Sequence, residues 1–450
     1  SVINSGSLRS IKRMASQNFE QLQQDLHPRL TRHEASVESD RCYFCYDAPC
    51  VTACPTGIDI PLFIRQISTD NPNGSARTIF NENILGGMCA RVCPTETLCE
   101  QVCVRNTAED NPIRIGELQR YATDHLMETG KQPFERAAES GATVAVVGAG
   151  PAGLACAHRL ALYGHRVEIF DAQPKPGGLN EYGIAAYKTV DDFAQAEVDY
   201  ILSIGGIEVK HNQRLGVEIT IDQLKADYDA VFVGIGLSAV NTLGIEGQEL
   251  EGVLDAVEVI AELRQSDDLE ALDVAQRTVV IGGGMTAIDA AVQTKMLGSD
   301  EVTLAYRRGE DRMNASQFEQ DLAKVNGVVI RTWLQPLRVL GEQGKVSGVE
   351  FARMSIDTGK YEATGETLTI ACEKVLSAIG QVFDGADGIN HIELNKGRIE
   401  VDDERRTSDE KIWAGGDCIE GGEDLTVAAV QDGKLAAESI NKVLQEKANG

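Results

Sequence analysis

Eight of the 11 cysteines lie between residues 42 and 103, and this clustering limits what the chain can fold into more than any other feature. They are Cys42, Cys45, Cys50, Cys54, Cys89, Cys93, Cys99 and Cys103. Thiolates are soft ligands, and close spacing lets one loop supply several of them to a small inorganic cluster. The run C-x2-C-x4-C-x3-C-P resembles the bacterial ferredoxin pattern, whose fourth cysteine serves a second cluster. The stretch therefore predicts iron–sulfur clusters.

Zinc sites and disulfides are the alternative uses of these thiols. Two zinc sites of four cysteines each are possible, but zinc sites usually contain paired C-x2-C knuckles, and only Cys42 and Cys45 have that spacing. Residues 1–40 are polar and show no apolar segment of a secretion signal. Disulfides therefore lack the oxidising context that favours them, and we expect reduced thiols in a cytoplasmic protein.

Charge and composition exclude several classes of partner. The formal net charge is −27, and this field repels nucleic acids and anionic membrane surfaces. No segment approaches the roughly 18 consecutive apolar residues that cross a bilayer. A length of 450 residues with 44 glycines fits about three domains of α/β type.

The pattern along the chain changes near residue 142. No alternating strand pattern precedes it, so residues 1–138 are expected to be mostly helical, with helices over Ile60–Ser68 and Gly116–Glu128. Residues 142–171 then read as strand, glycine turn, helix and strand, and residues 277–308 repeat this order. Two such units predict two doubly wound domains. A further helix is expected from about Val427.

The first glycine motif is Gly148-x-Gly150-x-x-Gly153, between an apolar strand and a helix. Its glycines allow a tight turn and close approach of the backbone to a pyrophosphate, which the helix amino end also attracts. Asp171 ends the next strand, where an acceptor for ribose hydroxyls belongs. A glycine turn that serves packing alone is the alternative.

The second motif is Gly282-x-Gly284-x-x-Ala287, and here the following strand ends in Arg307 and Arg308. Arginines at this place can bind the 2′-phosphate of NADP, whereas an acid would favour NAD. The alternative is that both are solvated surface charges. Glu310 and Asp311 follow closely and would weaken phosphate binding.

Catalytic side chains are not expected in this chain. The histidines show no metal-ligand spacing, and no pair of nucleophile and base is recognisable. Asp417 lies in a G-G-D turn before the last helix, whose amino end could stabilise negative charge on a reduced flavin. The chemistry is therefore assigned to cofactors, and side chains bind and tune them.

A set of longer motifs runs from about Cys42 to Ile440: C-Y-D-A-P-C, C-A-R-V-C-P-T-E-T-L-C, I-G-E-L-Q, V-G-A-G-P-A-G, P-G-G-L, I-G-G-G-M-T-A-I-D and A-G-G-D. With them the chain resembles the dihydropyrimidine dehydrogenase family, and most closely the small subunits of its two-subunit bacterial members. It is similar, more distantly, to the small subunit of glutamate synthase.

The resemblance implies a multidomain α+β fold, in which a helical iron–sulfur domain precedes two Rossmann-like domains, the second inserted in the first. The helical domain would span 1–138, and the FAD domain 139–240 and 379–450. The NAD(P)H domain would span 241–378.

The resemblance also implies two interleaved [4Fe–4S] clusters. Cys42, Cys45, Cys50 and Cys103 would hold one cluster. Cys54, Cys93 and Cys99 would hold the other, with Gln119 as an unusual fourth ligand. Cys89 would then hold no iron, whereas a plain count of eight cysteines would make it the last ligand.

The cofactor sites implied by the resemblance follow the glycine motifs. FAD would lie along Gly148, Gly150, Pro151, Ala152, Gly153, Asp171, Pro176, Gly177, Gly178, Leu179, Lys188, Leu215, Gly416, Asp417, Thr426 and Val427. NADPH, or less favourably NADH, would meet Gly282, Gly283, Gly284, Met285, Thr286, Arg307, Arg308, Ala378, Ile379 and Gly380. Lys188 stands where the family often has arginine.

The implied activity is electron input to a pyrimidine reductase. A hydride would pass from NAD(P)H to FAD, and single electrons would pass through both clusters to a separate FMN-containing subunit in a hetero-oligomer. That partner would reduce uracil or thymine, because no pattern for an FMN barrel is found here. The alternatives are a glutamate synthase small subunit, another NADPH-dependent electron-transfer module, and a cluster-bearing scaffold or sensor without turnover.

Overall fold

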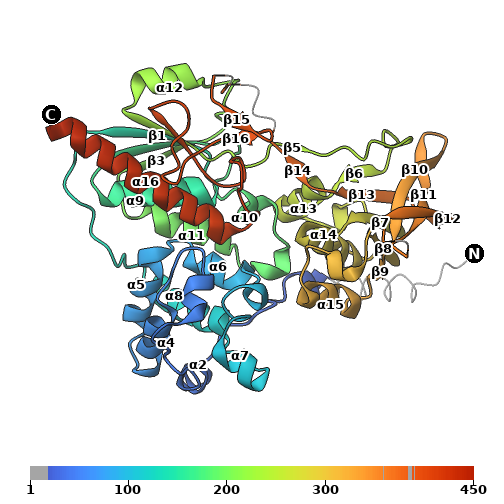
Figure 1. Ribbon diagram of the computed structural model, residues 1–450, viewed down its shortest axis with the longest axis horizontal. Helices are drawn as coiled ribbons and strands as arrows, with labels where there is room; N and C mark the ends of the chain where they lie inside the picture. The colour runs from blue at the N-terminus through green and yellow to red at the C-terminus, as the bar shows by residue number, and fades with distance from the viewer. Residues whose placement is uncertain (1–18, 358, 384–387, 390, 450) are drawn as a thin grey trace, which may run out of the picture. The chain divides into compact units, whose positions relative to one another are not determined.

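The computed structural model describes residues 19–449 except residues 358, 384–387 and 390 (Figure 1). The chain forms two compact units. Unit 1 contains residues 19–26, Tyr182–Asp191 and Val240–Val382, and unit 2 contains His27–Glu181, Asp192–Ala239 and residues 383–449. The helical character expected over residues 1–40 thus concerns in part residues 1–18, which lie outside the described residues.

Unit 2 begins with a bundle of short helices. The described residues of this bundle form no strand. Side chains of Thr31, Asp59 and Asn71 cap three of these helices by accepting hydrogen bonds from first-turn N–H groups. The helices are α2 (Arg32–Asp40), α3 (Pro49–Ala53), α4 (Ile60–Ser68), α5 (Pro72–Glu82), α6 (Gly86–Val92), α7 (Val104–Glu109) and α8 (Ile115–Met127). The helices expected over Ile60–Ser68 and Gly116–Glu128 are therefore confirmed.

A five-stranded parallel sheet forms the rest of unit 2. Its strands, in spatial order, are β17 (Ile412–Ala414), β4 (Ala230–Val233), β1 (Thr143–Val147), β2 (Arg166–Phe170) and β3 (Ile207–Lys210). Its helices are α9 (Pro151–Leu162), α10 (Leu179–Tyr182, whose last residue belongs to unit 1), α11 (Phe193–Leu202), α12 (Ile221–Asp227) and α16 (Thr426–Asn449). A small hairpin joins β15 (Leu394–Asn395) and β16 (Arg398–Ile399).

One apolar core joins the helical bundle to this sheet. Phe63, Phe80 and Leu118 of the bundle belong to the same buried cluster as Val146 of β1 and Ile440 of α16. The long red helix α16 crosses the sheet beside α9 in Figure 1. A side chain on Gly433 would meet the Ala152 carbonyl oxygen at 2.1 Å, so a glycine is needed where these two helices touch. The bundle and the sheet therefore form one body.

Unit 1 is built on a second five-stranded parallel sheet. The strands, in spatial order, are β6 (Val253–Asp255), β13 (Lys374–Ala378), β7 (Arg277–Gly282), β8 (Glu301–Ala305) and β9 (Val329–Arg331). Its helices are α13 (Ala256–Gln265), α14 (Met285–Met296) and α15 (Gln317–Val325). A separate two-stranded sheet pairs β5 (Ala239–Val240) with β14 (Gln381–Val382).

The two faces of the second sheet are covered differently. Successive residues of a strand point to opposite faces, and Val280 packs with the helices while Val279 and Ile281 pack on the other side. That other side is covered by an antiparallel sheet of β10 (Leu334–Glu342), β11 (Lys345–Ser355) and β12 (Glu362–Ala371). Burial on both faces explains why β7 reads as a continuous apolar run.

The chain order confirms the predicted fold class. Strands β6 to β13 of the second sheet lie in sequence between β4 and β17 of the first sheet, so the second doubly wound fold is inserted in the first. The three-stranded antiparallel sheet was not predicted. In the described part of the chain, no helix combines the length and the apolar character needed to cross a membrane.

Candidate functional site

Four thiols of the helical bundle border one cavity. Cys42, Cys45, Cys50 and Cys103 line it together with apolar residues of α4 and α7, and its empty volume is about 380 Å³ with open solvent included. Phe44 adopts a left-handed conformation at φ 51°, which turns the chain between Cys42 and Cys45. These are the four residues that the family resemblance assigns to one cluster.

Burial, together with negative charge on Cys42 and Cys103, raises the pKa of the Cys50 thiol to about 12. Burial also raises the pKa of Cys42. A group that holds all four as thiolates must bring positive charge, as iron ions do. The donor set thus fits an iron–sulfur cluster.

A second group of thiols lies next to the first. Cys93 interacts with Cys54, Cys89 and Cys99, and its hydrogen bond with Cys89, followed by burial, holds the Cys93 pKa well above its ordinary value. Cys99 interacts with both Cys54 and Cys50. Cys50 and Cys54 stand one turn apart on α3, so the same helix serves both groups.

Gln119 contacts α6, and Cys89 is part of this helix. The Gln119 amide donates a 2.7 Å hydrogen bond to the Gly86 carbonyl at the start of this helix, and Gln119 is buried. Cys89 is buried within the same helix. All eleven cysteines are free of disulfides. Among the described residues, no three His, Cys, Asp or Glu side chains converge closely enough to hold a single metal ion, whereas a [4Fe–4S] cluster takes one side chain per iron and so needs its ligands further apart.

The first glycine motif forms the turn between β1 and α9. Gly148 has φ 102°, and a side chain there would meet the Gly234 carbonyl oxygen at 2.3 Å. Gly150 is the N-cap of α9 and has no side-chain cap, so the first N–H groups of this helix are available to a phosphate. Asp171 accepts a 2.6 Å hydrogen bond from Ala149 in this turn, and its other oxygen accepts one from Gln173.

The P-G-G-L turn packs on this glycine turn. Gly177 donates a hydrogen bond to the Ala149 carbonyl, and a side chain on Gly178 would lie 2.8 Å from Gly150 Cα. The residues assigned to FAD around Gly148, Pro176 and Leu179 therefore come together in unit 2. Leu215 also belongs to unit 2, where it packs against the outer face of the first sheet.

The G-G-D turn joins the same site at the start of α16. Gly416 donates a 2.8 Å hydrogen bond to Asp432, and Thr426 contacts Asn180 of α10 at 2.8 Å. Burial and the nearby Asp424 carboxylate raise the pKa of Asp417 to about 7. Val427 is buried in the first turn of α16. The amino end of this helix therefore belongs to the flavin side of unit 2.

The second glycine motif repeats this construction in unit 1. Gly284 is the N-cap of α14 without a side-chain cap, as Gly150 is for α9. A side chain on Gly282 would meet the Ala378 carbonyl oxygen at 2.3 Å, so the end of β13 lies directly beside the turn. Ile379 and Gly380 follow β13 and are assigned to the same cofactor.

Arg307 and Arg308 follow β8 and are exposed. Among the described residues, neither guanidinium takes part in a salt bridge. The two acids that follow have other partners: Glu310 pairs with Lys324 at 2.9 Å, and Asp311 with Arg312 at 3.4 Å. The neighbouring acids thus do not neutralise the arginines.

Lys188 lies in unit 1, whereas the other residues that the resemblance assigns to FAD lie in unit 2. Its ammonium is buried and stands 2.7 Å from both Asp289 of α14 and Glu319 of α15. These two carboxylates raise the Lys188 pKa although burial opposes them. The role of Lys188 as a flavin contact stays a prediction, and this ion cluster was not predicted because its members are far apart in the chain.

Several contacts between the bundle and the first sheet were also not predicted. Glu197 of α11 accepts hydrogen bonds from the N–H groups of Met88 (2.9 Å) and Gly87, and so caps α6. Arg91 of α6 lies 3.3 Å above the Phe193 ring and also binds Asp124. No local pattern could have revealed these pairs, because the partners are far apart in the chain.

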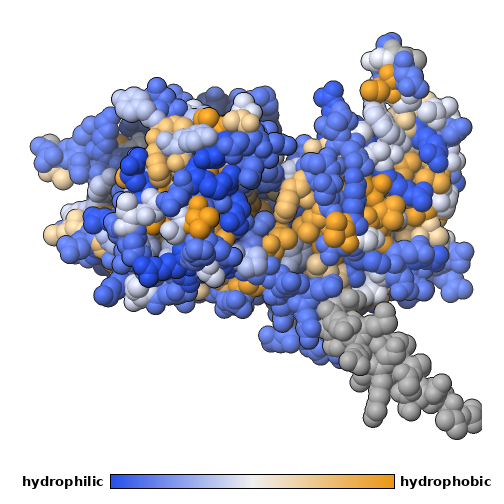
Figure 2. Space-filling model, turned by 90° about the horizontal axis from the view of Figure 1, so that it is seen from below, coloured by the Kyte–Doolittle hydropathy of each residue, from blue (hydrophilic) through white to orange (hydrophobic). Residues whose placement is uncertain are grey.

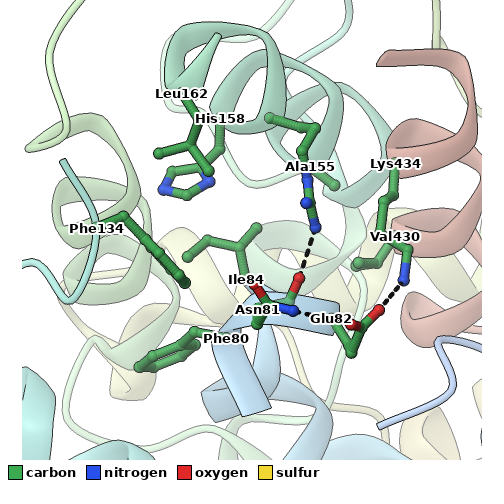
Figure 3. Close-up of a pocket in the computed structure, with 11 residues that line it drawn as sticks. Phe80, Asn81, Glu82, Ile84, Phe134, Ala155, His158, Leu162, Val430 and Lys434 are labelled. Atoms are coloured by element: carbon green, nitrogen blue, oxygen red, sulfur yellow. Dashed lines mark hydrogen bonds and ion pairs between the residues drawn. The ribbon is translucent and has the colours of Figure 1, made fainter. Parts of the chain in front are cut away.

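A small cavity marks the same junction (Figure 3). Lys434 of α16 binds Glu82 at 2.8 Å and the Thr56 carbonyl at 3.0 Å, and Arg159 of α9 donates to the Asn81 carbonyl. Figure 3 shows the contact between Lys434 of α16 and Glu82 of α5. Thr56 lies two residues after Cys54, so α16 is tied to the loop that carries the second thiol group.

Comparison with known proteins agrees with this architecture. The family model for dihydropyrimidine dehydrogenase domain II, 4Fe-4S cluster, matches residues 16–131, and that for pyridine nucleotide-disulphide oxidoreductases matches residues 142–433. The NAD-dependent dihydropyrimidine dehydrogenase subunit PreT of Escherichia coli is 36% identical over 94% of this chain and 97% of its own length. The chain belongs to this family. It is an NAD(P)H-dependent oxidoreductase that transfers electrons with a flavin and iron–sulfur chemistry.

Other relatives extend the comparison. The small chain of NADPH glutamate synthase from Escherichia coli is 32% identical over 94% of each chain. Thioredoxin reductase of T. acidophilum has the same fold over 67% of this chain and 97% of its own, with a TM-score of 0.54 and 22% identity. The resemblance found in the sequence motifs is thus confirmed, including its more distant branch.

The ligand set that the resemblance implies for a second cluster can be tested by substitution. Cys89→Ser should leave the iron content and the spectra of both clusters unchanged, because the family pattern assigns no iron to Cys89. Gln119→Ala should alter the electron paramagnetic resonance signal of one reduced cluster. Gln119→Glu, which keeps an oxygen donor, should retain more iron than Gln119→Ala. Loss of iron from Cys89→Ser would instead make all eight cysteines ligands.

Glu197 predicts a pH dependence of stability. Burial raises the pKa of this carboxyl from 4.5 to about 8. The folded protein therefore keeps a proton that the unfolded chain releases, and stability falls as pH rises through this window, by at most about 1.4 kcal/mol per pH unit. Glu197→Gln should remove this contribution, so urea unfolding of the variant should depend less on pH. An unchanged pH dependence would contradict the assignment.

Proposed function

We propose that this chain is the electron-input subunit of a dihydropyrimidine dehydrogenase. It would oxidise NAD(P)H with FAD and pass single electrons through two [4Fe–4S] clusters to a separate FMN-containing subunit, which reduces uracil or thymine to the 5,6-dihydro base. The four thiols that border one cavity, in the same compact unit as the first glycine turn, carry this proposal. The PreT relatives, whose name makes them subunits of such an enzyme, support it.

The chain's side chains would bind the cofactors and tune them. Cys42, Cys45, Cys50 and Cys103 would hold one cluster, and Cys54, Cys93, Cys99 and Gln119 the other. When bound, the flavin accepts a hydride and the clusters carry one electron at a time. The uncapped amino end of α9 would bind the FAD pyrophosphate, and the amino end of α16 would favour negative charge near the flavin ring.

Asp417 gives this flavin site an adjustable charge. Its pKa of about 7 lets the carboxyl lose a proton near neutral pH, which changes the charge at the amino end of α16. A protonated Asp417 would repel a negatively charged cofactor less than the carboxylate would. We assign it no proton transfer in catalysis.

The dinucleotide would bind at the second glycine turn, with NADPH favoured over NADH. The exposed guanidinium groups of Arg307 and Arg308, whose neighbouring acids pair with Lys324 and Arg312, support this preference. The names of the relatives include both cofactors. PreT is named NAD-dependent, and the glutamate synthase chain is named with NADPH.

Substitution of both arginines tests the preference. A charge-assisted contact to phosphate is worth about 1.5–3 kcal/mol, so Arg307→Ala and Arg308→Ala should each raise KM for NADPH about tenfold or more. KM for NADH should change little, because NADH has no 2′-phosphate. Steady-state oxidation of each cofactor with ferricyanide as acceptor measures both values. Arg312→Ala is a matched control on the same loop. Equal changes for NADH and NADPH would make the arginines general surface charges.

The electron relay is tested with the chain purified without oxygen. NAD(P)H should bleach its flavin absorbance and produce the resonance signal of reduced clusters, and the isolated chain should reduce ferricyanide but not uracil. Addition of the chain that co-purifies from the native source should restore uracil reduction. Uracil reduction by the isolated chain would contradict the two-subunit proposal, and absence of flavin bleaching would favour a scaffold or sensor.

A glutamate synthase small subunit is the second candidate, supported by 32% identity along nearly the whole chain. The two candidates share the input half of the reaction and differ in the partner. Identification of the co-purifying chain therefore separates them. Eleven unpaired thiols are consistent with a cytoplasmic location under either candidate.

A further inference from the structure

Exposed apolar side chains surround the cavity of the first thiol group. Tyr43 and Val104 line the cavity, while Tyr46, Leu62 and Val102 are direct chain neighbours of residues that line it. We call these five residues the apolar rim. The fully exposed Tyr46 is the extreme case, with a relative exposure of 100%, and the other four are 37% to 54% exposed.

A tyrosine ring left wholly in solvent contributes nothing to folding. In sequence, Tyr46 lies between Cys45 and Ala48, two residues that line the cavity. Large aromatic side chains in such places supply the central contacts of protein interfaces, because their area is large and few bonds must be fixed. In the left half of Figure 2 the apolar areas are small and set among hydrophilic atoms, whereas a broader apolar area lies to the right of centre. The rim therefore fits a small, transient interface.

The charges around the apolar rim are mostly negative. Asp47, Asp59, Glu109 and Asp110 are exposed on the loops and helix ends that carry the rim. Arg105 stacks on Tyr43 and pairs with Glu109 at 2.6 Å, so its charge is largely compensated. Two further exposed cations lie close by. Arg65 lies 4.2 Å above the Phe44 ring, and Arg114, between the cavity residues Ile113 and Ile115, pairs with Glu117 at 2.9 Å. A partner with a basic surface is complementary to this rim and to the net charge of −27.

The two thiol groups differ in their access to solvent. Cys42, Cys45, Cys50 and Cys103 are all partly exposed. In the second group Cys54 and Cys93 are partly exposed as well, whereas Cys99 and Cys89 are buried. Electron tunnelling slows steeply with distance, so a protein partner must approach the centre that lies nearest the surface. The first group meets this condition, because all four of its thiols are partly exposed and line one cavity with the exposed side chains of Tyr43 and Val104.

We propose that the apolar rim is the docking surface for the electron-accepting protein, and that this acceptor carries basic residues around its own redox centre. The inference rests on the proposed function, since it needs an electron-carrying cluster at the first thiol group. Tyr46 supplies the central apolar contact. Asp47 and the neighbouring acids steer the partner and set the salt dependence of association.

Cytochrome c, whose exposed haem edge is surrounded by lysines, serves as the probe acceptor. The holo-protein is mixed anaerobically with NAD(P)H and either cytochrome c or ferricyanide. Asp47→Lys should slow cytochrome c reduction about tenfold at low salt and flatten its salt dependence, and Tyr46→Ser should slow it about threefold. Ferricyanide reduction, flavin content and iron content should stay unchanged in both variants.

Two matched variants control for general effects. Val37→Ser removes another half-exposed apolar side chain of the bundle, and Glu446→Lys reverses an exposed charge near the end of α16. Both should reduce cytochrome c at the unaltered rate. Equal rates and equal salt dependence for Asp47→Lys and the unaltered protein would overturn the docking surface. A dimer in sedimentation that Tyr46→Ser dissociates would also overturn it, because a second copy would then cover the rim.

Failure of the proposed function gives a different result. If NAD(P)H reduces neither ferricyanide nor the flavin in the unaltered protein, the electron relay is wrong and the docking surface loses its basis. If ferricyanide is reduced in every variant but the rim substitutions leave cytochrome c reduction unchanged, only the docking surface is wrong.

Discussion

The carboxyl group of Glu197 holds the first turn of α6 from outside the helical bundle, and the arrangement of unit 2 depends on this contact. Without it, Gly87 and Met88 would bury two N–H groups with no acceptor, at about 1–3 kcal/mol each. Lys434 makes a second connection from α16, and the apolar core continues between them. The bundle is thus fixed to the flavin-type fold, and the thiol groups keep one position relative to its glycine turn.

The two glycine turns show how one local design serves two cofactors. In both, a glycine N-cap leaves the helix amino end open, and close backbone contacts exclude any side chain at the turn. The difference lies one strand further on, where Asp171 binds backbone N–H groups and Arg307 and Arg308 stand in solvent. Under the proposed function, selectivity between nucleotides would be decided by a few residues at strand ends, because the two turns share one construction.

The features that the sequence predicted are those whose cause is local. The glycines around Gly148 and Gly282 and the spacing of the cysteines carry their own chemistry, so both doubly wound folds and iron–sulfur clusters could be predicted from them, whereas the division of the cysteines into ligand sets needed the family resemblance. The cap by Glu197 and the Lys188 cluster join residues about a hundred positions apart, and no periodicity encodes such pairs. The antiparallel sheet was not predicted, because β12 is exposed along most of its length and lacks a clear apolar alternation.

Lys188 limits how the inserted domain can be exchanged between proteins. The inserted fold is one continuous segment from β6 to β13 in sequence, yet Lys188, which pairs with both Asp289 and Glu319, belongs to a ten-residue strip from Tyr182 to Asp191. A gene fragment that encodes the insertion alone would remove this ammonium group from two buried acids, and loss of one partner of a buried ion pair costs about 3–5 kcal/mol. Exchange of this domain between proteins by recombination must therefore carry the strip along, or first replace both acids.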